Sequence, residues 1–345
     1  MVKTARTGGD GGFDYIYADV DARKLYIPRS GQQNARIEVF NLDTLAKLGT
    51  VPDVNAHGAA TDTKSGHGFV SSKPVVMFDT KTLAVIRKID VQGNPDGILG
   101  DPFNHRVYIF SHTAPNATVI DAASGDIVGT IDLGGAPEEA VTDGKGKIYV
   151  DIENKDSIAV VDAKTLAVVG KYDIAGKGGG PGGLAIDVKN NILFASCHDP
   201  ATMVILNAGD GKILATIPIE AGTDGAGFNP NTMEAFSSAG NGTVSIIKEN
   251  SPTSFVAEQV VKTMNGARTM TVDTKNNWVL TMAIEYGPAP APAAAPAAPP
   301  AGAPGPGGAP GPGGVSGGRG GGRGRGPARG PMIPDSFTIL AVGTK

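Results

Sequence analysis

The feature of this chain that most constrains its fold is an internal repeat of about 40 residues. Each copy has an Asp, once an Asn, that closes an apolar segment; a short polar turn follows, and then a second apolar segment centred on an aromatic residue or Leu. These residues, which we call anchors, lie 39 to 44 positions apart along the 345 residues. The seven anchors are Asp19, Asp62, Asp101, Asp143, Asp187, Asn229 and Asp273.

The repeated unit has the pattern of short β-strands. Runs of Val, Ile, Tyr and Phe are broken by Gly, Asn, Asp and Pro, and apolar residues rarely recur at helical spacing. Most units continue with a third strand, a turn and a fourth strand, as in IAVVDAKTLAVVGKYDI (158–174). Four strands of this total length are typical of a propeller blade, and stacking blades around an axis buries both faces of each sheet. The sequence therefore predicts an all-β, seven-bladed β-propeller with four-stranded antiparallel blades.

The two ends of the chain indicate how such a ring closes. The seventh unit supplies only three strands, ARTMTVD (267–273), NNWVLTMAI (276–284) and DSFTILAVGT (335–344). The N-terminal VKTART (2–7) precedes the first unit and has no unit of its own. We therefore expect it to pair with the C-terminal strand, so that residues 1–345 form a single propeller domain.

Residues 287–334 interrupt the seventh unit between its second and third strands. They consist mainly of Gly, Pro and Ala, with Arg319, Arg323, Arg325 and Arg329 and no acid. This composition cannot build a core and predicts a disordered, partly polyproline II insert. An inert spacer and a cationic tether remain open as its role. Its RGG-like end resembles RNA-binding segments, but the chain carries a net charge of −4, so we do not expect a nucleic acid as partner.

Two segments carry a resemblance to a known family. IYVDIENKDSIAVVDAKTLAVVGKYDI (148–174) and VYIFSHTAPNATVIDAASGDIVGTIDL (107–133) resemble the YVTN-type β-propeller repeat of YncE-like proteins. The resemblance covers nearly all of the chain outside 287–334 and departs from the usual pattern at GFVSSKPVVMFD (68–79), where one loop is short. It implies a seven-bladed propeller in the periplasm or outside the cell. It implies little about reaction chemistry, because one fold hosts many functions.

Other features of the chain are compatible with export. The single cysteine, Cys197, excludes an internal disulfide, and no apolar run is long enough to span a membrane. No signal peptide is visible after Met1. We therefore expect a periplasmic or extracellular protein, a monomer without a membrane span, whose export signal has been removed.

The position five residues before each anchor, which we call the slot, varies in chemistry while its surroundings are alike. We expect each slot residue to begin the innermost strand of its blade and to face one mouth of the central channel. Six ionisable residues in seven slots favour binding of a cation, or of a polar ligand held by opposite charges; polar capping of strand ends around a wet channel is the alternative. The slot residues are Asp14, His57, Asp96, Glu138, Gly182, Asp224 and Arg268.

A divalent metal ion is a possible cofactor at this mouth, because His and carboxylate groups are the ligands of zinc and copper. The loops after the second strands should emerge on the same face and add further ligands. His112, Glu153 and His198 come from three successive blades, although the outward divergence of blades argues against one ion shared by all three. The candidate metal ligands are His57, Asp96, His112, Glu153, His198 and Glu285.

Three functions remain open from the sequence. The first is an exported binding propeller that presents the ring to a metal ion, a small polar ligand or a protein partner. The alternative is a metal-dependent hydrolase of lactonase type, or a lyase, in which His57 or Glu138 moves the proton. The third is an interaction module that uses other surfaces. No complete catalytic triad, nucleotide fingerprint or haem attachment site supports a more specific reaction.

Overall fold

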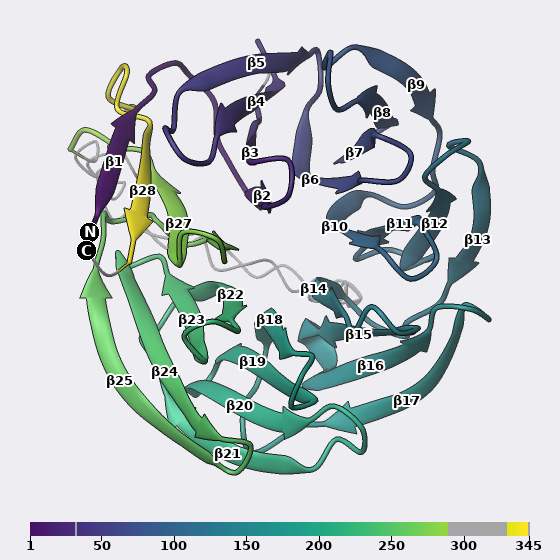
Figure 1. The fold of residues 1–345 in the computed structure, drawn as a ribbon, viewed down its shortest axis with the longest axis vertical. Helices are drawn as coiled ribbons and strands as arrows, with labels where there is room; N and C mark the ends of the chain where they lie inside the picture. Colours follow the sequence, from purple (N-terminus) through teal and green to yellow (C-terminus); the bar gives the residue numbers. More distant parts are fainter. Residues whose placement is uncertain (32, 289–329, 344–345) are drawn as a thin grey trace, which may run out of the picture. The chain divides into compact units, whose positions relative to one another are not determined.

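The computed structural model of the chain describes residues 1–31, 33–288 and 330–343. These residues form seven four-stranded antiparallel sheets arranged around an axis (Figure 1), which confirms the predicted fold class. The innermost strands are β2 (Tyr17–Asp19), β6 (Ala56–Asp62), β10 (Pro95–Asp101), β14 (Pro137–Thr142), β18 (Pro181–Asp187), β22 (Thr223–Asn229) and β26 (Met270–Asp273). The second strands are β3 (Lys24–Arg29), β7 (His67–Ser72), β11 (Arg106–Ser111), β15 (Lys147–Ile152), β19 (Ile192–His198), β23 (Glu234–Ala239) and β27 (Trp278–Ala283).

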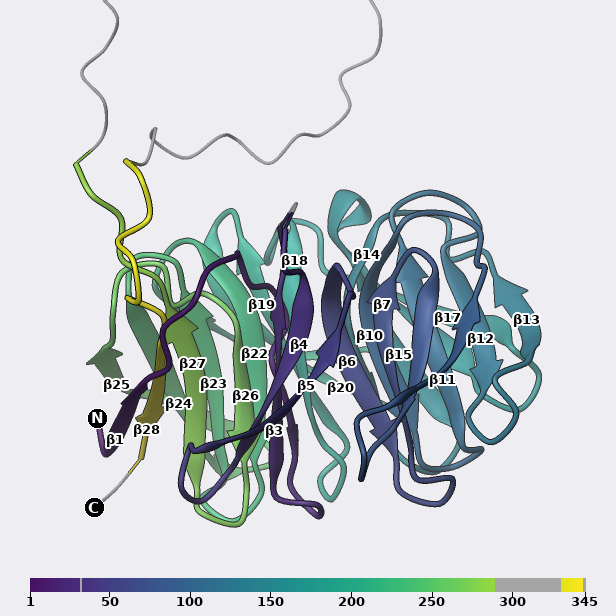
Figure 2. The same ribbon diagram turned by 90° about the horizontal axis from the view of Figure 1, so that it is seen from above.

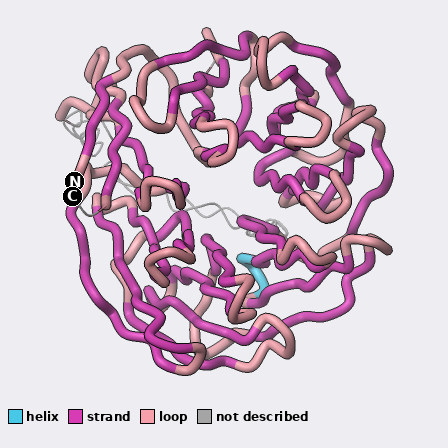
Figure 3. Tube along the Cα trace, viewed as in Figure 1, coloured by secondary structure: helices cyan, strands magenta, loops and turns pink. Residues whose placement is uncertain are grey.

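The outer half of each blade consists of two more strands. The third strands are β4 (Arg36–Asn41), β8 (Val75–Asp79), β12 (Ala117–Asp121), β16 (Ser157–Asp162), β20 (Ala201–Asn207), β24 (Thr243–Ser251) and β28 (Thr338–Val342). The outermost are β5 (Lys47–Pro52), β9 (Val85–Ile89), β13 (Ile127–Ile131), β17 (Ala167–Asp173), β21 (Ile213–Pro218), β25 (Ser254–Lys262) and β1 (Lys3–Arg6). The one helix among the described residues is a single 3₁₀ turn, η1 (Glu153–Lys155; Figure 3).

The seventh blade combines both ends of the chain. Its strands run β26–β27–β28–β1 from the axis outward, and β1 pairs antiparallel with β28 from Lys3–Ala341 to Arg6–Thr338. Most of the segment 287–334 lies outside the described residues. The described residues 286–288 and 330–333 belong to a second unit (286–333), in which the Gly287 N–H donates to the Pro331 carbonyl at 2.8 Å.

The core lies between neighbouring blades, because each sheet buries both of its faces. Successive residues of one strand therefore belong to different apolar clusters. Tyr149 packs with Leu184 and Leu193 of the next blade, whereas Val150 packs with Tyr108 and residues of the preceding one. Each such buried apolar side chain contributes about 1.5–3 kcal/mol. The alternation of strand side chains thus explains why the second and third strands are apolar almost throughout.

The anchors join adjacent blades at the end of the innermost strands opposite to the slots. Asp19 Oδ1 accepts a hydrogen bond from the Ala22 N–H in its own turn (2.9 Å), and its Oδ2 accepts one from the Thr61 hydroxyl of the next blade (2.8 Å). Asp101 accepts likewise from Thr142 of the following blade at 2.8 Å. The repeated Asp therefore fixes both a turn and an interface between blades.

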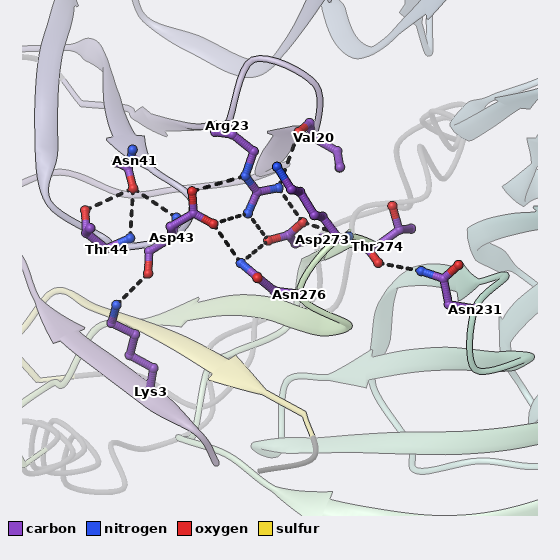
Figure 4. A network of polar contacts seen from close by, with 11 residues as sticks. Lys3, Val20, Arg23, Asn41, Asp43, Thr44, Asn231, Asp273, Thr274 and Asn276 are labelled. Carbon is purple, nitrogen blue, oxygen red and sulfur yellow. Dashed lines mark hydrogen bonds and ion pairs between the residues drawn. The ribbon is translucent and has the colours of Figure 1, made fainter.

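A charged network links the first and last blades at this same end (Figure 4). The Arg23 guanidinium donates to both carboxylate oxygens of the anchor Asp273, at 2.6 and 2.7 Å, and to Asp43 at 2.7 Å. The Asn276 side-chain amide donates to both carboxylates at 3.0 Å. The hydrogen bond from Arg23 lowers the pKa of Asp43 to about 2. This bidentate contact reinforces the junction at which the propeller closes.

Candidate metal-binding ring and central channel

The slot residues lie at one end of the innermost strands. His57, Asp96, Glu138, Gly182 and Asp224 are the second residues of β6, β10, β14, β18 and β22. Seen from the side, the strands run between the two faces of the propeller unit, so the slots and the anchors occupy opposite faces (Figure 2).

Two slots differ from the expectation that each begins a strand. Asp14 and Arg268 lie outside β2 and β26, which start at Tyr17 and Met270. The Asp14 carbonyl accepts a hydrogen bond from the Thr269 hydroxyl at 2.7 Å, so a side chain of the seventh blade is tied to the backbone of the first blade at this point. The side chains of Asp14 and Arg268 nevertheless form ion pairs with other slot residues.

One arc of the mouth consists of alternating acids and bases from the sixth, seventh, first and second blades. Arg268 contacts Asp224 at 2.7 Å and Asp14 at 3.2 Å. The other oxygen of Asp14 lies 2.9 Å from His57 Nδ1. Arg268 therefore lies between two carboxylates that would otherwise repel one another.

The second arc continues the alternation across the third and fourth blades. His57 Nδ1 is 3.3 Å from Asp96 Oδ1. His112, in the loop after β11, places its Nε2 3.4 Å from Asp96 Oδ2 and 3.1 Å from Glu138 Oε1. We call the seven side chains of the two arcs the ring. They are Asp224, Arg268, Asp14, His57, Asp96, His112 and Glu138.

The ring contains two groups of residues whose ligand atoms could surround a metal ion. Asp14, His57 and Asp96 form one group, and Asp96, His112 and Glu138 form the other; within each group the ligand atoms lie within 4.8 Å of one another. Asp96 is common to both. Burial raises the pKa of Asp96 in spite of the attraction of His57, and the hydrogen bond to Glu138 raises the pKa of His112.

Three of the sequence-predicted metal ligands lie outside both groups. Glu153, in η1, acts on His112 through its charge. His198 occupies the gap in the slot series, because a Cβ at Gly182 would lie 2.6 Å from its Nε2. Glu285 contacts Arg6 at 3.6 Å in the seventh blade. The blades diverge outward from the axis, so loop residues join the ring only where a long side chain reaches back, as His112 does.

Tyr15 crosses the channel just below the ring. Its hydroxyl, from the first blade, donates to Glu138 Oε2 of the fourth blade at 2.9 Å. Burial, together with the charges of four ring carboxylates, raises the pKa of Tyr15 well above its ordinary value. Sequence reasoning missed this residue. The available signal was its position directly after the slot, where four other blades have Gly58, Gly97, Gly183 and Gly225.

Those glycines allow the innermost strands to approach closely. A Cβ at Gly97 would lie 2.6 Å from the Glu138 carbonyl oxygen, and one at Gly183 would lie 2.7 Å from the backbone of Gly225. Glu139 is, with Tyr15, a large exception at this position. Its side chain reaches past the fifth blade to the sixth.

Glu139 Oε2 accepts hydrogen bonds from the backbone N–H groups of Leu184 (2.8 Å) and Ala226 (3.3 Å), in β18 and β22. Burial raises the pKa of Glu139 to about 8. Behind it, the fully buried Asp151 accepts the Glu139 N–H at 2.6 Å, and burial raises the pKa of Asp151 well above its ordinary value. Two acidic side chains therefore lie inside the propeller, beneath the ring.

A cavity of about 340 Å³ follows the axis beneath the ring. All seven blades line it with their innermost strands or the residues directly before them. Tyr15 and Glu138 line the end near the ring, whereas Gly100, Phe228 and Val272, each directly before an anchor, line the opposite end. The cavity is the central channel of the propeller.

Comparisons with known proteins agree with this architecture. No family model matches the chain. The uncharacterized protein YncE of Salmonella typhi and that of Salmonella typhimurium are each 22% identical to it over 196 residues, covering 54% of this chain. The chain spans about half the length of these curated relatives, 54% of each. This similarity confirms the YncE-like resemblance.

Solved structures of much lower identity share the fold. A chain of the mitotic checkpoint complex superimposes with a TM-score of 0.68 at 10% identity, covering 81% of this chain and 87% of that one. The WD40 repeats of RRP9 superimpose with a TM-score of 0.66 at 10% identity, covering 81% of this chain and 89% of that one. At this identity the likeness shows a propeller and nothing about ligands. Among the described residues, no helix has the length and apolarity that crossing a membrane requires.

Proposed function

We propose that this protein is a binding propeller whose ring takes one divalent transition-metal ion. The observation that carries the proposal is the position of Asp96, whose two carboxylate oxygens face different histidines, His57 and His112, at 3.3 and 3.4 Å. Asp14 and Glu138 complete the two groups. A metal ion at Asp96 would have imidazole and carboxylate ligands on either side.

The mixture of ligand types favours one class of metal. Calcium and magnesium are bound mainly by oxygen, whereas imidazole nitrogen together with carboxylate oxygen suits zinc, copper or nickel. Arg268 neutralises Asp224 and one oxygen of Asp14 on the far arc. This leaves the half of the ring that contains both histidines as the better place for a cation.

Export to the periplasm or the cell exterior is part of the proposal and is supported by the similarity to YncE. A small polar ligand or a protein partner at the same mouth, and a hydrolase or lyase reaction that uses His57 or Glu138, stay predictions. Each of them would use the same ring side chains, so metal binding is the property to measure first.

Titration of the chelator-treated protein with Zn²⁺ tests the proposal by calorimetry. We expect one site, and an affinity reduced at least tenfold in either His57→Gln or His112→Gln, because each histidine belongs to only one of the two groups and a single ion occupies one group. His105→Gln is the matched control, because His105 forms a comparable pair with Asp62 (2.8 Å) at the anchor end. Absence of a Zn²⁺ site, or an equal loss in His105→Gln, would contradict the proposal.

Zinc affinity should rise with pH between about 6 and 8. A histidine binds metal only after losing its proton, and the hydrogen bond that His112 donates to Glu138 raises the pKa of His112, so protons compete with the metal at neutral pH. Dissociation constants measured at pH 6, 7 and 8 check this. The slope should be smaller in whichever histidine variant loses zinc affinity; an affinity that does not change with pH would mean that the histidines are not ligands.

A further inference from the structure

The channel beneath the ring has a mixed lining, somewhat more apolar than polar, and is large enough for a small organic molecule. An apolar protein cavity of about 150 Å³ accommodates benzene, so a channel cavity of about 340 Å³ has room for an aromatic ring with a short side chain. The larger apolar side chains that line it include Ile98, Leu99, Val141, Leu184, Phe228 and Met270.

One polar group distinguishes this cavity from an ordinary apolar space. Glu139 lines it and uses Oε2 for both backbone N–H groups, which leaves Oε1 for a group inside the channel. The nearby Glu138 and Asp224 add negative charge that acts on Glu139. None of the described residues that line the cavity is Lys, Arg or His. The potential inside the channel therefore favours a positively charged group.

The channel meets the ring at Glu138, which belongs to both, and extends from there toward the anchor end. Tyr15 reaches across the axis from the first blade to Glu138 of the fourth, between the ring and the cavity. A molecule in the channel would therefore enter from the anchor end, which is lined by small and apolar residues such as Gly100 and Val272. Occupation of the channel does not require a metal ion in the ring.

We infer that the channel is a second binding site, for an arylalkylamine whose aromatic ring lies among the apolar side chains and whose ammonium group pairs with the Glu139 carboxylate. The ammonium group would donate to Glu139 Oε1, because the two backbone N–H groups both bind Oε2. A neutral molecule of the same shape would gain only the apolar part of the interaction. An anion of similar size would be repelled by the nearby carboxylates of Glu138 and Asp224.

Calorimetry with three probes of similar shape tests the inference on the full chain, in phosphate buffer without metal. We expect 2-phenylethylamine to bind with one site per chain, 2-phenylethanol at least tenfold more weakly, and 3-phenylpropionate not at all. Equal affinities for the amine and the alcohol, or no binding of the amine at millimolar concentration, would overturn the inference.

Two variants place the site in the channel. Glu139→Gln can still accept the backbone N–H groups, and it should reduce amine affinity to that of the alcohol while leaving alcohol affinity within twofold. Ala140→Leu adds bulk to the cavity wall and should weaken amine and alcohol alike. Glu258→Gln, on the exposed outermost strand β25, is the matched control and should change nothing. Unchanged amine binding in Glu139→Gln would overturn the assignment, whatever the ring binds.

Discussion

Replacing Arg29 by Met should lower the free energy of unfolding by about 3–5 kcal/mol. The Arg29 side chain is 0% exposed, donates to Glu38 at 2.8 Å and to the backbone carbonyls of Gly8 and Asp10, and lies 3.2 Å above the Phe337 ring. It thus ties the segment after β1 and the segment before β28 to the first blade. The substitution would leave Glu38 without this buried partner and the two carbonyls without their donor.

Urea unfolding of the full chain measures this effect. Arg87→Met is the control, because the Arg87–Asp126 pair (2.8 Å) is 46% and 65% exposed, and pairs of this kind contribute at most about 1 kcal/mol. If the free energy of unfolding of Arg29→Met lies within about 1 kcal/mol of that of the unsubstituted chain, closure of the propeller does not depend on this contact.

Asp96→Asn should have the largest effect on zinc affinity, a loss of about 100-fold or more. Asn keeps the size of the side chain but removes the charge that both candidate groups share. A single histidine substitution removes a ligand from only one group, so its effect should be smaller. The measurement is competition with a chromophoric chelator, together with thermal unfolding to verify that the variant is folded.

Asp224→Asn is the matched control for this experiment. Asp224 is a ring carboxylate of similar exposure, but it pairs with Arg268 and lies outside both groups. Its substitution should change zinc affinity less than threefold. A larger loss in Asp224→Asn than in Asp96→Asn would mean that the ring acts through its total charge and that no metal ion is bound at Asp96.

The repeat allowed the blades and the position of the ring to be predicted, because equivalent positions in successive units have equivalent places around an axis. Knowing that Asp62 and Asp101 were anchors was enough to bring His57 and Asp96 to one mouth. The same logic failed where a unit departs from the average. In the first blade, β2 begins only at Tyr17, three residues after the slot residue Asp14, and the sequence pattern contains no measure of that shift.

Contacts across the axis could not be predicted from periodicity. Tyr15 meets Glu138 because its side chain is long enough to cross a narrow channel, and Glu139 meets Leu184 and Ala226 for the same reason. The channel is narrow because glycines occupy the equivalent position in other blades. A comparison of the residues directly after each slot would have singled out both side chains, although not their partners.

The most direct test of the metal site is a crystal of the protein soaked in zinc, with anomalous diffraction measured at the zinc edge. We predict an anomalous peak about 2 Å from a carboxylate oxygen of Asp96 and from a ring nitrogen of His57 or His112. A peak at the His105–Asp62 pair instead, or no peak at the ring in protein that was fully exposed to zinc, would contradict it.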